Sequence, residues 1–276
     1  MNFATLFSYD GCMNNPNDPS LPTRRRIGII GGMGPAATVD LMQKIIAATP
    51  ASRDQDHVPM VVWNVPQIPE RVGHIHDATS PSPAPAMRTA AKALAEAGAE
   101  AIAIACNTAH FWAADVEDAS GLPLLHIADA ALAALAHRSA TPRRILLLAT
   151  TGTLHAGIYS SRAAAAGVKL ELPDEAAQAQ LARAIAAVKA GQIEVARALL
   201  FPILDAAIAS GVDALLLACT ELPLVVRSSK FEAQSVDATA ALAQAIVAFS
   251  LDTSARSAAA PRTTQLRKIH LGDQVA

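Results

Sequence analysis

The sequence predicts an α/β protein in which one structural pattern is repeated. Short runs of apolar, β-type residues alternate along the chain with longer segments rich in alanine and leucine. Strands that are apolar throughout and separated by helices are typical of βαβ units in buried parallel sheets. One strand and its ending also occur twice, since Gly98 and Cys106 recur 113 residues later as Gly211 and Cys219. This recurrence predicts an internal duplication.

The first set of elements is expected to start at Arg24. The preceding residues 1–23 are rich in Asn and Pro and are interpreted as a flexible leader, which includes the incidental Cys12. The apolar runs that predict strands are residues 27–30, 58–63, 101–105 and 124–127, and the alanine-rich helix formers between them are residues 37–48 and 85–96.

The second set repeats this order. Its predicted strands are residues 145–149, 168–172 and 214–218, and its predicted helices are residues 129–137, 178–190 and 193–210, followed by a closing helix at 237–247. The segments 25–34 and 143–152 also match, because each has two arginines, an apolar strand and a glycine-containing turn. Residues 253–276 lack hydrophobic periodicity and are interpreted as a flexible tail.

Composition and charge restrict the partners. The chain has 276 residues, of which 52% are hydrophobic, so it can form a core large enough for two domains. A net charge of -2 and an aromatic content of 4% argue against nucleic acid and anionic membranes as partners. Met1–Ser20 lacks the pattern of a signal peptide, and no apolar window is long enough to span a membrane. We therefore expect a cytoplasmic protein that keeps its cysteines as thiols and binds a small molecule.

Two cysteines fall where the chemistry of a parallel sheet is usually found. Cys106 and Cys219 each follow a predicted strand, and ligands collect at such strand ends because the next helix presents free N–H groups. If the two halves face each other, one thiolate can remove a proton from a carbon while the other thiol protonates the opposite face. Asn107, Thr108 and Thr220 supply donors for the negative charge that develops. The pair predicts inversion of a carbon centre.

At these residues the sequence resembles the aspartate/glutamate racemase family, which comprises cofactor-independent amino-acid racemases. The matching motifs are Gly31–Thr38, Val65–Arg71, Cys106–His110 and Cys219–Pro223, and the resemblance extends over about residues 25–250. It implies two pseudo-symmetric, Rossmann-like domains with mainly parallel sheets, an active site in the cleft between them, and Cys106 and Cys219 as catalytic acid and base. It also implies a small amino-acid substrate, a homodimer, and no pyridoxal phosphate or metal.

The resemblance also implies domain limits. The closing helix would return to the first domain, which then comprises residues 24–128 and 236–252, and the second domain comprises residues 129–235.

The substrate contacts implied by motif position come from both halves. They are Met33, Gly34, Gln67, Arg71, Asn107, Thr108, Thr151, His155, Thr220 and Glu221. The aspartate branch is favoured, because glutamate racemases typically have Asp-Ser-Gly after the first strand and His-Tyr after the second Cys-Thr. Arg71 is the leading candidate for the side-chain carboxylate, although it could also be a solvated arginine at a helix start. His155 stands where some relatives carry a cation, so glutamate is a second expected substrate.

Two other classes of protein remain open alternatives. The pattern Gly32-x-Gly34-x-x-Ala37 fits an NAD(P)-dependent oxidoreductase, but the second strand ends in Trp63-Asn64 without the acid that would hold a ribose. A non-catalytic small-ligand binding protein could have the same strands but would not need two thiols.

The histidines give weaker signals. His74 and His76 are two residues apart and do not share a helix face, so no metal site is expected there. His110 and His126 are expected near the cleft, where they either tune the Cys106 thiolate and position a loop or serve a structural role.

Overall fold

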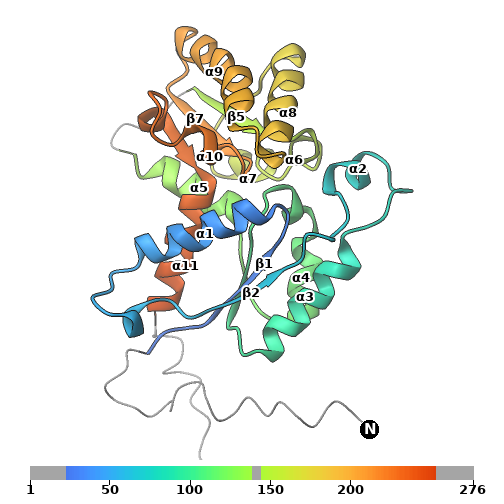
Figure 1. The fold of residues 1–276 in the computed structure, drawn as a ribbon, viewed down its shortest axis with the longest axis vertical. Helices are drawn as coiled ribbons and strands as arrows, with labels where there is room; N and C mark the ends of the chain where they lie inside the picture. Colours follow the sequence, from blue (N-terminus) through green and yellow to red (C-terminus); the bar gives the residue numbers. More distant parts are fainter. Residues whose placement is uncertain (1–22, 139–143, 253–276) are drawn as a thin grey trace, which may run out of the picture.

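The computed structural model describes residues 23–138 and 144–252, which form two parallel four-stranded sheets (Figure 1). The first sheet has the strand order β2-β1-β3-β4 and the second has the order β6-β5-β7-β8. The strands are β1 Ile27–Gly31, β2 Met60–Asn64, β3 Ala101–Ile104, β4 Leu124–Leu125, β5 Ile145–Ala149, β6 Leu170–Glu171, β7 Ala214–Ala218 and β8 Ser235–Asp237. The predicted α/β class is confirmed.

The two sheets have equivalent topologies. In the first, β1 lies between β2 and β3, with Ile27 paired to Met60 on one side and to Ala101 on the other. In the second, β5 lies between β6 and β7, with Ile145 paired to Leu170 and Ala214. The strands β3 and β7 that precede the two cysteines therefore occupy the same place in their sheets, as the duplication predicts.

Helices cover both faces of each sheet. The longer ones are α1 Pro35–Ala48, α3 Ala84–Glu96, α4 Ala113–Ser120, α5 Ile127–Ala136, α8 Glu175–Lys189, α9 Ile193–Ala209 and α11 Ala238–Leu251. The shorter ones are α2 Arg71–His76, α6 Thr151–His155, α7 Ser160–Ala165 and α10 Pro223–Val226, with 3-10 turns at Asp54–Asp56, Thr108–Trp112 and Glu232–Gln234.

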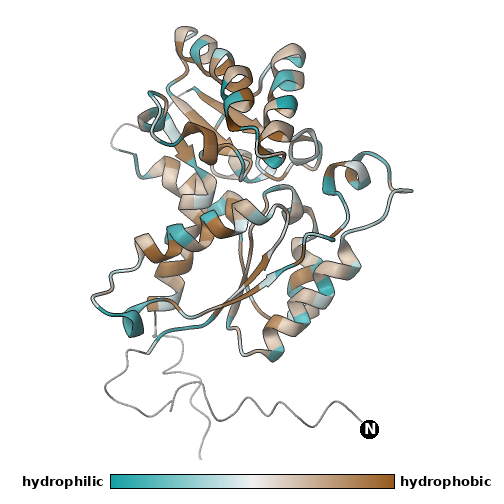
Figure 2. Ribbon diagram, in the orientation of Figure 1, coloured by the Kyte–Doolittle hydropathy of each residue, from teal (hydrophilic) through white to brown (hydrophobic). Residues whose placement is uncertain are grey.

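The largest hydrophobic core joins the two sheets. It includes Ile29 of β1 and Leu147 of β5, together with apolar residues of α1, α5 and α11. Two further cores lie on the other faces, where α3 covers the first sheet and α8 and α9 cover the second. Figure 2 shows apolar strands in the interior, and Figure 1 shows α11 running alongside α1 and α5. Each central strand is thus buried on both faces, which explains why it is apolar throughout.

Capping residues set several element ends that periodicity did not predict. The predicted helix 178–190 begins at Glu175, because the Asp174 carboxylate accepts a hydrogen bond from the amide of Ala177. The predicted strand 124–127 ends at Leu125, because the His126 side chain accepts from the amide of Ala128 and caps α5. The predicted strand 168–172 is reduced to Leu170–Glu171.

Some predictions concern residues that the structure does not describe. The leader 1–23, apart from Thr23, and the tail 253–276 lie outside the described residues, as does Cys12. The division into residues 24–128 with 236–252 and residues 129–235 stays a prediction. Within residues 23–138 and 144–252, no helix is long and apolar enough to cross a membrane.

Candidate functional site

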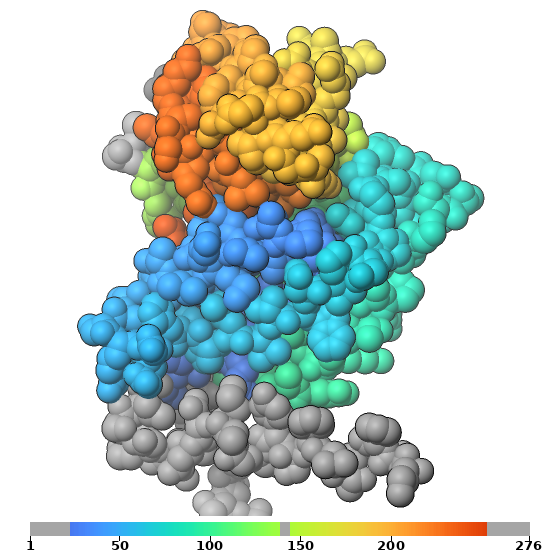
Figure 3. Space-filling view, viewed as in Figure 1, coloured from blue at the N-terminus to red at the C-terminus, as the bar shows by residue number. Residues whose placement is uncertain are grey.

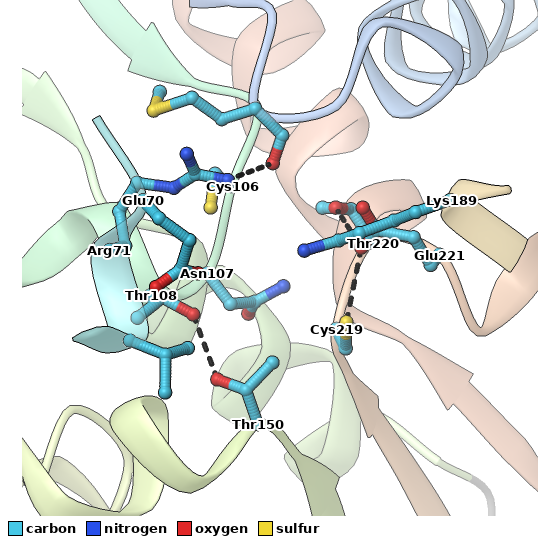
Figure 4. Close-up of a pocket in the computed structure, with 12 residues that line it drawn as sticks. Glu70, Arg71, Cys106, Asn107, Thr108, Thr150, Lys189, Cys219, Thr220 and Glu221 are labelled. Carbon is cyan, nitrogen blue, oxygen red and sulfur yellow. Dashed lines mark hydrogen bonds between the residues drawn. The ribbon is translucent and has the colours of Figure 1, made fainter. Parts of the chain in front are cut away.

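A pocket lies where the carboxyl ends of β3 and β7 approach each other between the two sheets. Figure 3 shows the yellow and orange segments of the second sheet seated on the blue and cyan segments of the first, and Figure 4 shows the pocket side chains. Eight residues expected from the sequence line it: Met33, Arg71, Cys106, Asn107, Thr108, Cys219, Thr220 and Glu221. Both cysteines are buried free thiols, and they come from opposite sides of the pocket (Figure 4).

Four expected contacts do not line this pocket. Gly34 is adjacent to it, since a Cβ on that residue would lie 3.6 Å from Glu221 Oε1. Gln67 is exposed. Thr151 and His155 are exposed on α6, where they contact His76 of α2 through a 3.2 Å hydrogen bond and a 5.1 Å ring contact.

Four further residues line the pocket that were not among the candidates expected from the sequence. They are Glu70, Val72, Thr150 and Lys189. Glu70 and Val72 flank the expected Arg71, and Thr150 precedes the expected Thr151, so proximity to known candidates was the available signal. Lys189 is the last residue of α8 and belongs to no motif, and a lysine at a helix C-terminus is common for reasons unrelated to ligands.

Cys219 is held as a protonated thiol by its surroundings. Its Sγ donates a hydrogen bond to Glu221 Oε2 at 3.1 Å, and Thr220 Oγ1 donates to the same oxygen at 3.1 Å. Burial, and then the negative charge of Glu221, raises the pKa of the Cys219 thiol well above its usual value. The other carboxylate oxygen of Glu221 is buried and has no partner among the described residues. Cys219 is therefore suited to deliver a proton.

The two residues after Cys106 are fixed by side chains that follow β5 of the other sheet. Tyr159 donates a hydrogen bond from its hydroxyl to Asn107 Oδ1 at 2.5 Å. Thr108 Oγ1 lies 2.9 Å from the hydroxyls of both Thr150 and Thr153. The site is thus assembled from both sheets, and Asn107 Nδ2 is left buried without a partner among the described residues.

Two cations enter the pocket from opposite sides (Figure 4). The guanidinium of the buried Arg71 donates to the carbonyl oxygens of Met33 at 3.3 Å and Pro69 at 3.1 Å, while its Nε is buried without a partner. Lys189 extends from α8 past Glu221. Neither cation forms a salt bridge with an acidic side chain among the described residues. The arrangement leaves positive charge available to an anionic ligand.

His110 connects the first cysteine to the start of α5. Its Nδ1 lies 2.9 Å from the carbonyl oxygen of Cys106, and its Nε2 accepts a hydrogen bond from the amide of Ile127 at 3.2 Å. The ring is therefore neutral, with its proton on Nδ1. Burial, and then the neighbouring His126, lowers the pKa of His110 to about 3. The histidine positions the backbone of Cys106 and does not carry charge there at neutral pH.

The glycines after β1 have a packing role that differs from a dinucleotide fingerprint. Gly32 has φ +94°, and a Cβ there would lie 2.4 Å from the carbonyl carbon of Val65. Its amide donates to Thr38 Oγ1 at 2.9 Å, so it is not available to a phosphate. In the part of the chain that the structure describes, no group of three or more His, Cys, Asp or Glu side chains could hold a metal ion.

Comparisons with known proteins agree with this geometry. The profile of the Asp/Glu/Hydantoin racemase family matches residues 30–246. The aspartate racemase of Picrophilus torridus is similar in structure, with a TM-score of 0.73 and 34% identity over 81% of this chain and 93% of that one. An aspartate racemase homologue from Pyrococcus horikoshii OT3 has a TM-score of 0.65 and 25% identity over 81% and 98%. The broad specificity amino-acid racemase RacX of Bacillus subtilis (strain 168) is 28% identical over 80% of this chain and 96% of its own length.

Proposed function

The chain belongs to the Asp/Glu/Hydantoin racemase family, and on that premise we propose that it interconverts L- and D-aspartate, and also glutamate, without a cofactor. The observation that carries this proposal is the pair of buried thiols, from equivalent strand ends, that line one pocket. The similarity to the Picrophilus torridus aspartate racemase supports aspartate, and the similarity to the broad specificity racemase of Bacillus subtilis supports a wider substrate range.

The chemistry that we propose is a proton transfer at Cα with two thiol groups. For one enantiomer, the Cys106 thiolate removes the α-proton and Cys219 delivers its own proton to the opposite face. This direction uses the resting state of Cys219, whose proton is held against Glu221. The roles are exchanged for the other enantiomer, and proton exchange with solvent restores the starting state.

Polar groups of the pocket would stabilise the intermediate charge. Loss of the α-proton shifts negative charge onto the α-carboxylate, and fixed N–H and O–H donors lower the barrier to that shift. Asn107 Nδ2 is a buried donor without a partner among the described residues, and Thr108 lies next to it in the chain. These two groups are the proposed α-carboxylate contacts.

The second carboxylate of the substrate would lie between the two cations. Arg71 and Lys189 approach the pocket from opposite sides and have no acidic partner among the described residues. Two positive charges favour a dicarboxylic amino acid over a neutral one. We therefore place aspartate ahead of alanine or serine as a substrate.

The test is racemisation of each enantiomer of aspartate by single cysteine variants in D₂O, with no cofactor added. Cys106→Ser and Cys219→Ser should each lower the rate of inversion by about 10²-fold or more, since loss of general acid or base catalysis typically has that effect. Cys12→Ser is the matched control, because Cys12 belongs to neither of the two duplicated cysteine motifs, and it should behave as wild type.

Deuterium content adds a second readout to this experiment. If each cysteine serves one face, the two variants should differ in which enantiomer still exchanges its α-proton. Wild-type inversion rates in both variants would exclude the two-thiol mechanism. A requirement for added NAD(P), with a matching absorbance change, would favour the oxidoreductase alternative, and binding without turnover would favour the ligand-binding alternative.

A further inference from the structure

Tyr159 is a buried polar residue outside the pocket that the proposed chemistry does not yet use. It precedes α7, its side chain is 1% exposed, and its ring belongs to the core that joins the two sheets. Its hydroxyl contacts Asn107 Oδ1 at 2.5 Å, and the structure gives that hydroxyl no other hydrogen-bond partner among the described residues. Removing this hydroxyl from the interior of the protein therefore has one direct consequence, which falls on Asn107.

The hydrogen bond determines which end of the Asn107 amide faces the pocket. Burial, and then the charge of Asp237, raises the pKa of Tyr159 well above its usual value, so the hydroxyl keeps its proton. A buried hydroxyl with one neighbour has to donate to that neighbour, because a buried donor left without an acceptor is unfavourable. The acceptor at Asn107 is Oδ1, and the NH₂ group must then point the other way.

The NH₂ group at the other end has no partner. Asn107 Nδ2 is buried and unsatisfied, although buried polar atoms are nearly always hydrogen-bonded. Figure 4 shows this nitrogen directed into the pocket, toward the space between the two cysteines. An unpartnered donor at such a place is suited to a ligand oxygen.

We propose that Tyr159 is a positioning residue that locks the Asn107 amide with its NH₂ group toward the α-carboxylate of the substrate. This inference rests on the proposed racemase function. The terminal torsion of an asparagine is broad and has little intrinsic preference, so the orientation of the amide has to come from a neighbour. A residue that holds a substrate-contacting side chain in its orientation usually has a measurable effect on activity.

The hydrogen bond from Tyr159 orients Asn107 alone. Thr108 is held by a separate pair of hydroxyls, on Thr150 and Thr153, which form no hydrogen bond with Tyr159. Tyr159→Phe keeps the ring in the core and removes only the oxygen. The variant therefore tests the orientation of one amide without removing the other connection between Cys106 and the second sheet.

The main measurement is aspartate racemisation by Tyr159→Phe, Asn107→Ala and the double variant. With its amide free to turn, Tyr159→Phe should lose about 10-fold or more in kcat with a smaller change in KM, because the Asn107 contact strengthens as charge develops on the carboxylate. In the Asn107→Ala background the same change should have almost no further effect, since Tyr159 acts only through Asn107. The control is Ser250→Ala, which removes another buried hydroxyl. The Ser250 hydroxyl donates a hydrogen bond of 2.8 Å to the carbonyl oxygen of Arg25, and neither residue lines the pocket, so kcat should be unchanged.

Two outcomes would overturn the proposal. One is a kcat for Tyr159→Phe within about twofold of wild type. The other is an equal loss of activity with and without Asn107, which would indicate a general structural effect.

A binding measurement separates this inference from the proposed function. The side-chain ¹⁵N–¹H₂ resonances of Asn107, assigned by their absence in Asn107→Ala, should shift when aspartate is added to wild type and shift less in Tyr159→Phe. If wild type does not racemise aspartate but these shifts are seen, the racemase proposal fails and the positioning role stands. If aspartate does not move the Asn107 resonances of an active wild type, the positioning role fails and the racemase proposal stands.

Discussion

Several of the buried polar atoms that have no partner among the described residues belong to side chains of the pocket. Arg71 Nε, Asn107 Nδ2 and Glu221 Oε1 are all buried and unsatisfied among the described residues, and all three belong to pocket-lining side chains. Such atoms are costly in the folded state, and an amino acid with two carboxylates and an ammonium group can satisfy both donors and acceptors. We propose that these unsatisfied atoms, which lower the stability of the folded protein, are the ones that contact the substrate.

Lys189→Met tests whether recognition includes the distal carboxylate. We expect kcat/KM for aspartate to fall about 10- to 100-fold, the range given by losing one charged hydrogen bond of 1.5–3 kcal/mol. The decrease in kcat/KM for alanine, which has no second carboxylate, should be much smaller. The measurement is the ratio of kcat/KM for the two substrates, and Lys92→Met, on the exposed surface of α3, is the control. Equal losses for both substrates would show that Lys189 does not contact the distal carboxylate.

Within the pocket, sequence alone predicted two groups of consecutive residues, in addition to Met33 and Arg71. Cys106, Asn107 and Thr108 form one such group, and Cys219, Thr220 and Glu221 form another. Lys189 and Tyr159 could not be predicted in this way, because they reach the site through the packing of α8 and α7 against the ends of other elements. Neither has a neighbour in the sequence that marks it as functional.

At the level of elements, His110 joins the end of β3 to the start of α5. The imidazole hydrogen bonds the carbonyl oxygen of Cys106 with one nitrogen and the amide of Ile127 with the other, so it must stay neutral to hold both. In the unfolded chain its pKa returns to near 6.5, whereas in the folded protein it is about 3. Between these values the unfolded state binds a proton that the folded state does not, and stability falls as the pH falls.

His110→Gln should weaken this dependence on pH. The wild-type free energy of unfolding, measured by urea denaturation, should decrease steadily from pH 6.5 to pH 4. The variant should have a lower free energy of unfolding than wild type at pH 7, but this free energy should decrease less as the pH is lowered. Some dependence of the stability on pH will remain, because burial also lowers the pKa of His126, to about 4. His137→Gln, an exposed histidine after α5, should reproduce the wild-type slope, and a wild-type slope in His110→Gln would contradict the assignment.

Most of the long elements were predictable from the sequence, whereas the shortest helices were not. Continuous apolar runs such as Ile145–Ala149 and Ala214–Ala218 were placed at the observed bounds, because a strand buried on both faces has a distinctive composition. The helices α2, α6 and α10 have four to six residues, too few to show a helical period. The strand β8 has three residues and forms only because β7 is beside it.

On the scale of the whole molecule, a buried aspartate connects the two sheets through charge. Asp40 of α1 is 2% exposed and forms ion pairs with Lys44 and with Arg227, which follows α10 of the second sheet. Lys44 also pairs with Asp237 at the start of α11, at 2.6 Å. These contacts link α1, which begins directly after Gly34 beside the pocket, to the segment that follows Glu221.

Asp40→Asn should therefore destabilise the protein. Removing one member of a buried pair typically costs about 3–5 kcal/mol, and the expected loss here is near the lower end because Arg227 is half exposed. The measurement is the free energy of unfolding in urea at fixed ionic strength. Asp205→Asn, in the exposed pair with Lys230, should cost less than about 1 kcal/mol. Similar small losses in both variants would show that the Asp40 network contributes little.

The position of α11 has a consequence for how the protein is made. This helix packs against α1 and α5, yet it is synthesised after β7 and β8, more than a hundred residues later than α5. During synthesis, the strands of the first sheet leave the ribosome before α11 is made. Part of the apolar surface that α11 covers in the folded protein is exposed during that time. A nascent chain in this state is prone to aggregate, so a premature stop before Ala238 would yield an insoluble product even though it retains both cysteines.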